Sequence, residues 1–161
     1  MSNVHSIIVT QDDLSDGNII RLLQEHREEM LKHSQPENVH ALDVSQLTAT
    51  NITFWSAWLR NGDSNEFAGC GALKDLGEGH GELKSMRTRT QFLRKGVAQA
   101  LLSHILHKAE DLGFKRISLE TGTQAVFLPA HSLYTRNGFE NCEPFGDYEA
   151  ASVSVCMTKL L

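Results

Sequence analysis

Three strand-like segments follow one another between Ile52 and Thr88, and this run constrains the fold more than any other feature of the sequence. The first segment is β-branched and aromatic on both faces, as in a buried strand. Short turn-forming stretches separate the three, although we expect the first turn to exceed two residues. The predicted strands are Ile52–Leu59, Glu66–Leu73 and Gly81–Thr88, with turns at Asn61-Gly62 and Asp75–Gly79.

Helices and strands alternate in the remainder of the chain. Leu93–Leu112 has apolar residues at helical spacing and is followed by Gly113, a good helix stop. Three adjacent strands followed by such alternation predict a mixed sheet with helices on its faces. The other predicted elements are a strand at Ser6–Val9, a helix containing Ile20 to Leu31, a short helix between His33 and Asn51, a strand at Arg116–Thr121, a helix within Ala125–Asn137 and a closing strand pair in the last 20 residues.

Residues in the second and third predicted strands indicate the local geometry of these strands. Gly69 and Gly71 thin the second strand, which indicates a close neighbour or a bulge. In the third strand, alternation places Glu82, Lys84, Met86 and Thr88 on one face unless a bulge intervenes.

The length and composition limit the class of protein. A chain of 161 residues suits one domain, residues 1–161, and it has no apolar stretch long enough for a membrane span. The polar start lacks a secretory signal, and three widely spaced cysteines favour a reducing compartment, so we expect a cytoplasmic protein. With 15 Lys and Arg against 20 Asp and Glu, the net charge of −5 disfavours a nucleic-acid coat.

The positive charge is concentrated in one segment. No Asp or Glu occurs from Leu83 to Ala109, and six of the 15 basic residues lie there, which leaves nine against all 20 acids elsewhere. Arg94 and Lys95 fall in the expected first turn of the long helix, where acids are normally favoured. Gly96 would let the backbone approach a ligand closely, so the sequence predicts a polyphosphate site, with an ordinary exposed helix start as the alternative.

Two blocks of sequence carry a family resemblance. Arg94-Lys95-Gly96-Val97-Ala98-x-Ala100-Leu101-Leu102 resembles motif A of the GNAT superfamily of acetyl-CoA-dependent N-acetyltransferases. Ala130-x-x-Leu133-Tyr134-x-x-Asn137-Gly138-Phe139 resembles its motif B, in the expected order. The resemblance covers essentially the whole chain. It implies a small bacterial-type member with an α/β (α+β) fold, a mixed, mostly antiparallel sheet of six to seven strands and about four helices.

The resemblance implies acetyl-CoA as the co-substrate. The family's polar Q/R position is Leu93 here, so any phosphate contact there must come from the backbone, with Arg94 or Lys95 adding charge. A position that is often Asn in the family is Phe127, which would pack on the cofactor instead. The implied cofactor-binding residues are Met86, Arg87, Thr88, Leu93, Arg94, Lys95, Gly96, Val97, Ala98, Gln99, Phe127, Ala130 and Leu133.

The resemblance also implies an acid and a base. Tyr134 occupies the position of the usual general acid, which protonates the departing thiolate; a packing aromatic is the alternative. Glu82, four residues before Met86, matches the position of a catalytic Glu, and a surface ion pair with Lys84 or Arg116 is equally compatible with the sequence. Glu120, at the end of the next strand, is the second candidate base.

The sequence says less about the acceptor amine than about the cofactor. His33, Glu37 and His40 lie where family members usually bind the acceptor, and we expect a small-molecule primary amine. The eight histidines show no metal-binding spacing, so no metal is expected. We expect no nucleic-acid or membrane partner and leave a homodimer open. The competing functions are a non-catalytic acyl-CoA-binding or sensing module, a protein or peptide amine acetyltransferase, a toxin acting on aminoacyl-tRNA and an unrelated nucleotide-phosphate binder.

Overall fold

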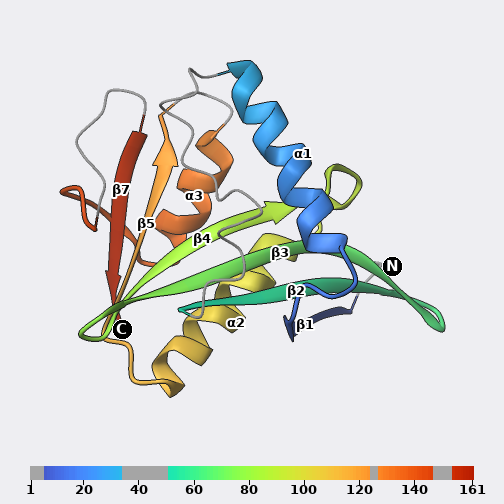
Figure 1. Cartoon of the computed structure of the whole chain (residues 1–161), viewed down its shortest axis with the longest axis horizontal. Coiled ribbons are helices and arrows are strands. Elements are labelled where there is room, and N and C mark those ends of the chain that lie inside the picture. The colour runs from blue at the N-terminus through green and yellow to red at the C-terminus, as the bar shows by residue number, and fades with distance from the viewer. Residues whose placement is uncertain (1–5, 34–50, 124–126, 147–153) are drawn as a thin grey trace.

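The computed structural model describes residues 6–33, 51–123, 127–146 and 154–161. Its seven strands form one sheet in the order β1-β2-β3-β4-β5-β7-β6 (Figure 1). The elements are β1 (Ile7–Asp12), α1 (Asn18–His33), β2 (Ile52–Asn61), β3 (Ser64–Gly77), β4 (His80–Thr88), the 3-10 turn η3 (Thr90–Phe92), α2 (Val97–Asp111), β5 (Arg116–Gly122), α3 (Leu128–Arg136), β6 (Glu140–Cys142) and β7 (Ser154–Leu160).

This architecture confirms the predicted fold class. The sheet is mixed, because β4 and β5 are parallel and every other neighbouring pair is antiparallel. Three α-helices lie in the described ranges, one fewer than the expected four. The expected short helix between His33 and Asn51 lies outside the described residues. None of the described helices has the length and apolar character needed to cross a membrane.

The meander is longer than the sequence suggested. β3 has 14 residues and reaches from Ser64 to Gly77, well beyond the predicted Glu66–Leu73. Asn61 pairs directly with Ser64, so the first turn contains only Gly62 and Asp63, and the expectation of a longer turn is wrong. Gly62 has φ of 63°, a conformation that glycine adopts without strain and that makes the two-residue turn accessible.

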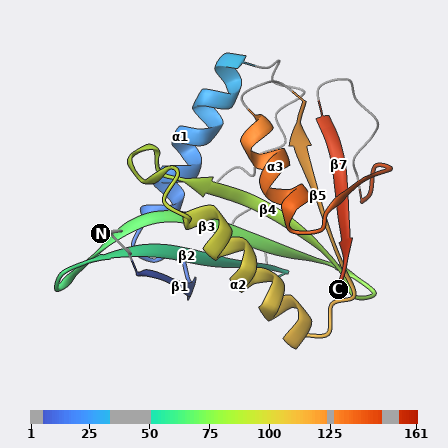
Figure 2. The ribbon, with the colours of Figure 1, turned by 180° about the vertical axis from the view of Figure 1, so that it is seen from behind.

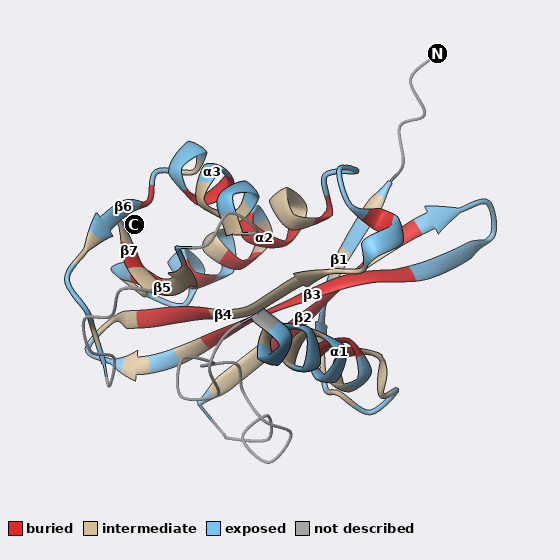
Figure 3. Ribbon diagram, turned by 90° about the horizontal axis from the view of Figure 1, so that it is seen from above, coloured by how far each residue is buried: buried red, intermediate tan, exposed pale blue. Residues whose placement is uncertain are grey.

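The helices cover opposite faces of the sheet. Figure 3 shows α1 on one face and α2 with α3 on the other, and Figure 2 shows α2 crossing the meander while α3 lies beside β5. The larger core cluster joins the buried stripe of α2 to the sheet and to α3. A smaller cluster packs Ile19, Leu22 and Leu23 of α1 against the opposite face. We refer to these as the α2 face and the α1 face.

A β-bulge interrupts β4 and overturns the simple alternation expected there. Cys70 pairs with Arg87 and Ala72 with Lys84, so Ser85 and Met86 together oppose the single residue Gly71. Ser85 has φ of 56°, in the left-handed region. Met86 consequently joins the α2-face cluster, whereas Arg87 contacts α1. The alternation was expected to hold unless a bulge intervened, and because one does, Glu82 and Met86 lie on opposite faces.

The two glycines of β3, Gly69 and Gly71, allow neighbouring segments to approach the strand closely, as the sequence predicted. A Cβ on Gly69 would lie 2.6 Å from the carbonyl oxygen of Arg87, and one on Gly71 would lie 2.8 Å from Cδ1 of Ile105. Both distances are too short for carbon, so the absence of side chains at these positions lets β4 and α2 approach β3 closely. A neighbour and a bulge are both present, as Gly69 and Gly71 indicated.

Candidate functional site

The parallel strands β4 and β5 separate beyond a short paired stretch. Their register runs only from His80 to Glu82 on β4 and from Arg116 to Ser118 on β5. Past that stretch the strands diverge as a V (Figure 1), while β5 stays paired with β7 up to Gly122. Within the described parts of the chain, the edge of β4 that faces β5 therefore has no strand partner beyond Glu82, and its backbone groups there can bind a ligand.

The start of α2 lies near the end of β4, and it differs from the prediction. The helix begins at Val97 with Gly96 as its N-cap, so Arg94 and Lys95 precede the first turn and do not belong to it. Arg94 has φ of 63° and Gly96 has φ of 87°, which turns the loop sharply before the helix. A left-handed conformation at a non-glycine residue costs free energy and is concentrated at functional sites.

This loop has the composition of an anion site. Leu93, Arg94, Lys95 and Gly96 are all exposed. No side chain caps α2 and no acid occurs in its first turn. The first N–H groups of a helix have no acceptor inside the helix, and with the helix dipole they favour an anion such as a phosphate. Val97 is 1% exposed, so it could contribute only its backbone.

The six basic residues of the acid-free segment do not form one patch. Lys84 contacts Glu82 and Arg87 contacts Glu29. Arg89 donates to the carbonyl oxygen of Phe67 and lies over the ring of Phe92. Lys108 lies in the last turn of α2, at the opposite end of the helix. The charge at the helix start thus comes from Arg94 and Lys95.

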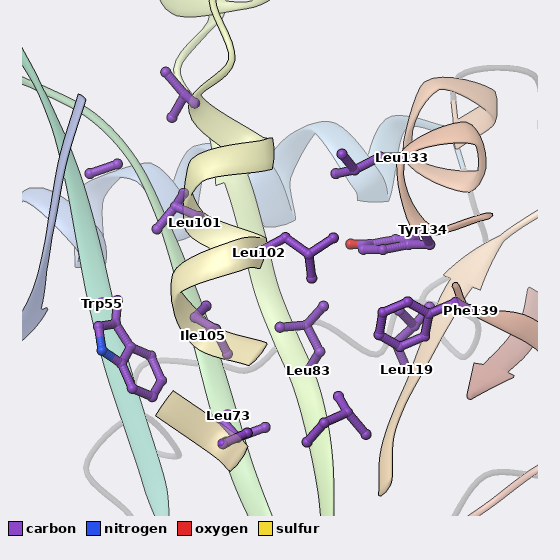
Figure 4. Packing of buried hydrophobic residues seen from close by; sticks show 14 of the residues in the cluster. Trp55, Leu73, Leu83, Leu101, Leu102, Ile105, Leu119, Leu133, Tyr134 and Phe139 are labelled. Carbon is purple, nitrogen blue, oxygen red and sulfur yellow. The ribbon is translucent and has the colours of Figure 1, made fainter. Parts of the chain in front are cut away.

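Tyr134 of α3 faces the space between α3 and α2. Its ring is buried, 7% exposed, and packs edge-on against Phe139 with the ring centroids 5.7 Å apart. Figure 4 shows the hydroxyl pointing from α3 toward Leu102 of α2. Burial raises the pKa of this phenol well above its ordinary value, so the hydroxyl stays protonated at physiological pH. The ring therefore packs in the core, and the role of the hydroxyl as a general acid stays a prediction.

The remaining predicted cofactor residues of α3 lie on the same side. Leu133 is buried in the α2-face cluster, and Ala130 packs against it. Phe127 is the N-cap of α3. Its ring covers Gly122 so closely that a Cβ on Gly122 would overlap the ring. The end of β5 and the start of α3 therefore meet next to the V.

Glu82 and Glu120 lie on the α1 face. Their strand neighbours Leu83 and Leu119 belong to the α2-face cluster, and alternation sends the two carboxylates to the other side. Glu82 is only 4% exposed, and its Oε2 lies 3.2 Å from Nζ of Lys84. The predicted ion pair with Lys84 is thus present, but it is buried and not at the surface.

The two carboxylates share one neighbourhood. Burial raises the pKa of the Cys156 thiol, and the nearby groups Cys142, Glu120 and Glu82 raise it further. Cys156 pairs directly with Glu120 across β5 and β7. Both candidate bases therefore lie near the point where β4 and β5 begin to separate, on the face opposite α2 and α3.

The predicted acceptor residues are only partly described. His33 ends α1, but its side chain lies outside the described part of the structure, as do Glu37 and His40 altogether. On α2, His104 contacts Trp55 edge-on, and exposed His107 lies 3.7 Å from Asp111. Among the described residues, no group of three or more His, Cys, Asp or Glu could hold a metal ion.

Sequence reasoning missed one cluster beside the V. Arg87 of β4 donates a 2.9 Å hydrogen bond to Glu29 of α1, and half-buried His26 lies close enough for both charges to affect its pKa. The only available signal was the helical spacing of His26 and Glu29, since their partner Arg87 lies 58 positions from Glu29.

The family model for the acetyltransferase (GNAT) family matches residues 19–139, which include α1, the V, the α2 loop and α3. The chain belongs to this acetyltransferase family. Bacillus subtilis has a relative named uncharacterized N-acetyltransferase YsnE, which is 51% identical over 150 residues, 93% of this chain and 97% of that protein. Escherichia coli has one named uncharacterized N-acetyltransferase YedL, which is 49% identical over 140 residues, 87% of this chain and 86% of that protein.

A solved GNAT-type structure agrees with the fold. A protein of Klebsiella pneumoniae, described as a candidate acyl-CoA N-acyltransferase, superposes with a TM-score of 0.79 at 28% identity. The match covers 96% of this chain and 97% of that one. Membership of the family makes this protein an acyltransferase. The V, the α2 loop and Tyr134 can therefore be considered together as parts of one candidate site.

Proposed function

We propose that the protein is an acetyl-CoA-dependent N-acetyltransferase that transfers the acetyl group to the primary amine of a small molecule by direct attack. One observation carries the proposal. The uncapped start of α2, with exposed Arg94 and Lys95 before it, lies on the same side of the sheet as Tyr134 and close to the open edge of β4. The family membership supports the same activity.

The residues present fit acetyl-CoA, whose thioester supplies the acetyl group. Arg94, Lys95 and the free N–H groups of Val97 to Gln99 would hold its phosphates. Gly96, with its positive φ and no side chain, leaves room for such an approach. The backbone of Met86 to Thr88, Phe127, Ala130 and Leu133 would hold the rest of the molecule.

Three groups of the chain would do the chemistry. Unpaired backbone N–H groups near Met86–Thr88 would stabilise negative charge on the reacting carbonyl oxygen. Glu82 would accept the proton that the amine loses, with Glu120 as the second candidate. The Tyr134 hydroxyl, which stays protonated, would donate a proton to the departing sulfur.

Two other functions use the same geometry. A non-catalytic acyl-CoA-binding or sensing module would need the α2 loop but not Glu82. A protein or peptide amine acetyltransferase would need both. We favour a small acceptor because Glu82, the candidate base, is nearly inaccessible from solvent, which suits a small amine better than a chain segment. The three cysteines are free thiols, and we place the enzyme in the reducing cytoplasm.

An amine-panel assay tests the proposal. Release of free CoA from acetyl-CoA would be followed with primary amines of different charge and size, together with a peptide with a free N-terminus. We expect CoA release that depends on a small amine. A thermal-shift comparison of acetyl-CoA with ATP and NAD precedes it, because selective binding stabilises the protein by mass action. Selective binding without CoA release from any amine would favour the non-catalytic module.

A further inference from the structure

The sheet-facing stripe of α1 changes character along the helix. Ile19, Leu22 and Leu23 are buried against the α1 face. One turn later, half-buried His26 and Met30 continue the stripe, and exposed Glu29 lies beside them. His26 and Glu29 lie where α1 reaches Arg87 near the end of β4, next to the V. Polar side chains thus replace part of the hydrophobic packing at this end of α1.

Among the described residues, the side chain of Glu29 is the one ion-pair partner of Arg87. Its Nη2 donates a 2.9 Å hydrogen bond to Oε2 of Glu29, with side-chain exposures of 29% for Arg87 and 52% for Glu29. A guanidinium offers five N–H donors in a planar fork. Partly exposed ion pairs contribute little to stability. Stability is therefore a weak reason for an Arg here, and the remaining donors can bind another group.

His26 lies beside this pair and adds no positive charge. Burial, and next the charge of Arg87, lower the pKa of His26 to about 4, so the imidazole is neutral at physiological pH. Its Nδ1 is buried and has no hydrogen-bond partner in the described part of the chain. The cation of Arg87 is therefore balanced here by the exposed carboxylate of Glu29, which a ligand carboxylate could replace.

We propose that Arg87 binds a carboxylate of the acceptor, so that the acceptor is an amine that also carries a carboxylate, an amino-acid-like molecule. The proposal rests on the proposed acetyltransferase function. The bulge at Ser85 is what turns the Arg87 side chain to the α1 face. The same face carries Glu82 and Glu120, which attract the ammonium end of such a molecule. A bidentate guanidinium–carboxylate contact suits the planar fork of Arg.

A comparison of matched acceptors tests the proposal. CoA release would be measured with amino acids and with the corresponding amino-acid amides, for the wild type, Arg87→Gln, Glu29→Gln and Arg60→Gln. Arg60, exposed at the end of β2, is the charge-matched control. Because each variant is compared with the wild type on both acceptors, the different basicity of amino acids and amides cancels.

We expect Arg87→Gln to lower kcat/KM for the amino acid about 10- to 100-fold through KM, and to change it less than about threefold for the amide. Glu29→Gln should leave or lower the KM for the amino acid, because it removes a competing carboxylate. Equal losses on both acceptors in Arg87→Gln, or a 10-fold rise in KM in Glu29→Gln, would overturn the proposal. CoA release from amides alone would overturn it but keep the proposed function. Release from no amine would overturn both.

Discussion

The side chains of Gln99 and Asn137 are joined by two hydrogen bonds of 2.9 Å, in which each amide donates to the oxygen of the other. Gln99 is in the first turn of α2, and Asn137 is the C-cap of α3. The helix that follows the proposed phosphate loop is thus tied to the helix that carries Tyr134. Gln99, proposed to contact the cofactor, has its side chain committed to this bond and can offer only its backbone.

Loss of this link should destabilise the fold. Asn137→Ala removes both amide bonds and a third bond, of 2.7 Å, to the carbonyl oxygen of Leu133. We expect a decrease of about 1–3 kcal/mol in the free energy of unfolding, measured by urea denaturation. Ser103→Ala, which removes only an exposed bond to Gln99, is the control and should cost less than about 0.5 kcal/mol. Equal effects of the two variants would contradict a special role for the link.

Removal of the two cations before α2 should weaken cofactor binding. We expect the Arg94→Ala, Lys95→Ala double variant to bind acetyl-CoA about 10- to 100-fold less tightly, with a smaller dependence of affinity on salt, since it lacks two phosphate contacts. Isothermal titration calorimetry measures both quantities. Lys108→Ala, at the opposite end of the same helix, should bind as the wild type does. An unchanged affinity in the double variant would show that the phosphates bind elsewhere.

Tyr134→Phe separates packing from proton donation. The ring stays in the core against Phe139, so we expect an unchanged unfolding midpoint and an unchanged affinity for acetyl-CoA. Turnover should fall about 100-fold if the hydroxyl donates a proton to the departing sulfur. Single-turnover measurement of CoA release tests this, and wild-type turnover in the variant would leave Tyr134 as a packing residue.

Glu82→Gln and Glu120→Gln distinguish the two candidate bases. The amide in Glu82→Gln can still accept a hydrogen bond from Lys84, so the local structure should persist. We expect kcat to fall about 100-fold in Glu82→Gln, because the amide cannot accept the proton of the amine. The kcat of Glu120→Gln should stay within about threefold of the wild type. The reverse pattern would transfer the role to Glu120.

His26 should make the protein acid-sensitive. The pKa of His26 is about 4 in the folded state and 6.5 without the fold, so the unfolded chain binds more protons between these values. His26 therefore does not reduce the free energy of unfolding above about pH 6.5. Below that pH, protonation of His26 in the unfolded chain lowers the free energy of unfolding progressively as the pH falls toward 4. Between pH 7 and pH 4.5, we expect the free energy of unfolding to fall by about 2 kcal/mol less in His26→Gln than in the wild type. Parallel urea titrations at the two pH values measure the difference.

Local patterns predicted the elements of the fold. The meander, the buried stripe of α2 and the glycine pair Gly69 and Gly71 all follow from side-chain size and periodicity, which act between near neighbours. The start of α2 was predicted too early because Arg94 adopts a left-handed conformation, which its residue type does not suggest. Gly69 and Gly71 indicated a bulge, but its position at Ser85 was not predicted for the same reason, since Ser85 carries no sequence mark of a positive φ.

Contacts between distant segments could not be predicted. The pairing of Glu29 with Arg87 depends on how α1 crosses the sheet, and the burial of Glu82 depends on packing that its own strand does not reveal. The sequence left a surface ion pair and a catalytic base as equal alternatives for Glu82. The structure shows the ion pair with Lys84 that one alternative predicted, but the pair is buried and not at the surface.

The bulge in β4 accommodates Ser85 as one extra residue and thereby reverses the faces that strict alternation would give Met86 and Arg87. In a chain without Ser85, strict alternation would itself place Met86 toward α2 and Arg87 toward α1, because one residue would again oppose Gly71. It would lose only the extra twist that a bulge gives to the end of a strand. A single deletion could therefore straighten β4 without exchanging its two sets of side chains. A comparison of turnover between this shortened protein and the wild type would show whether activity depends on the curvature of β4 or on its side chains.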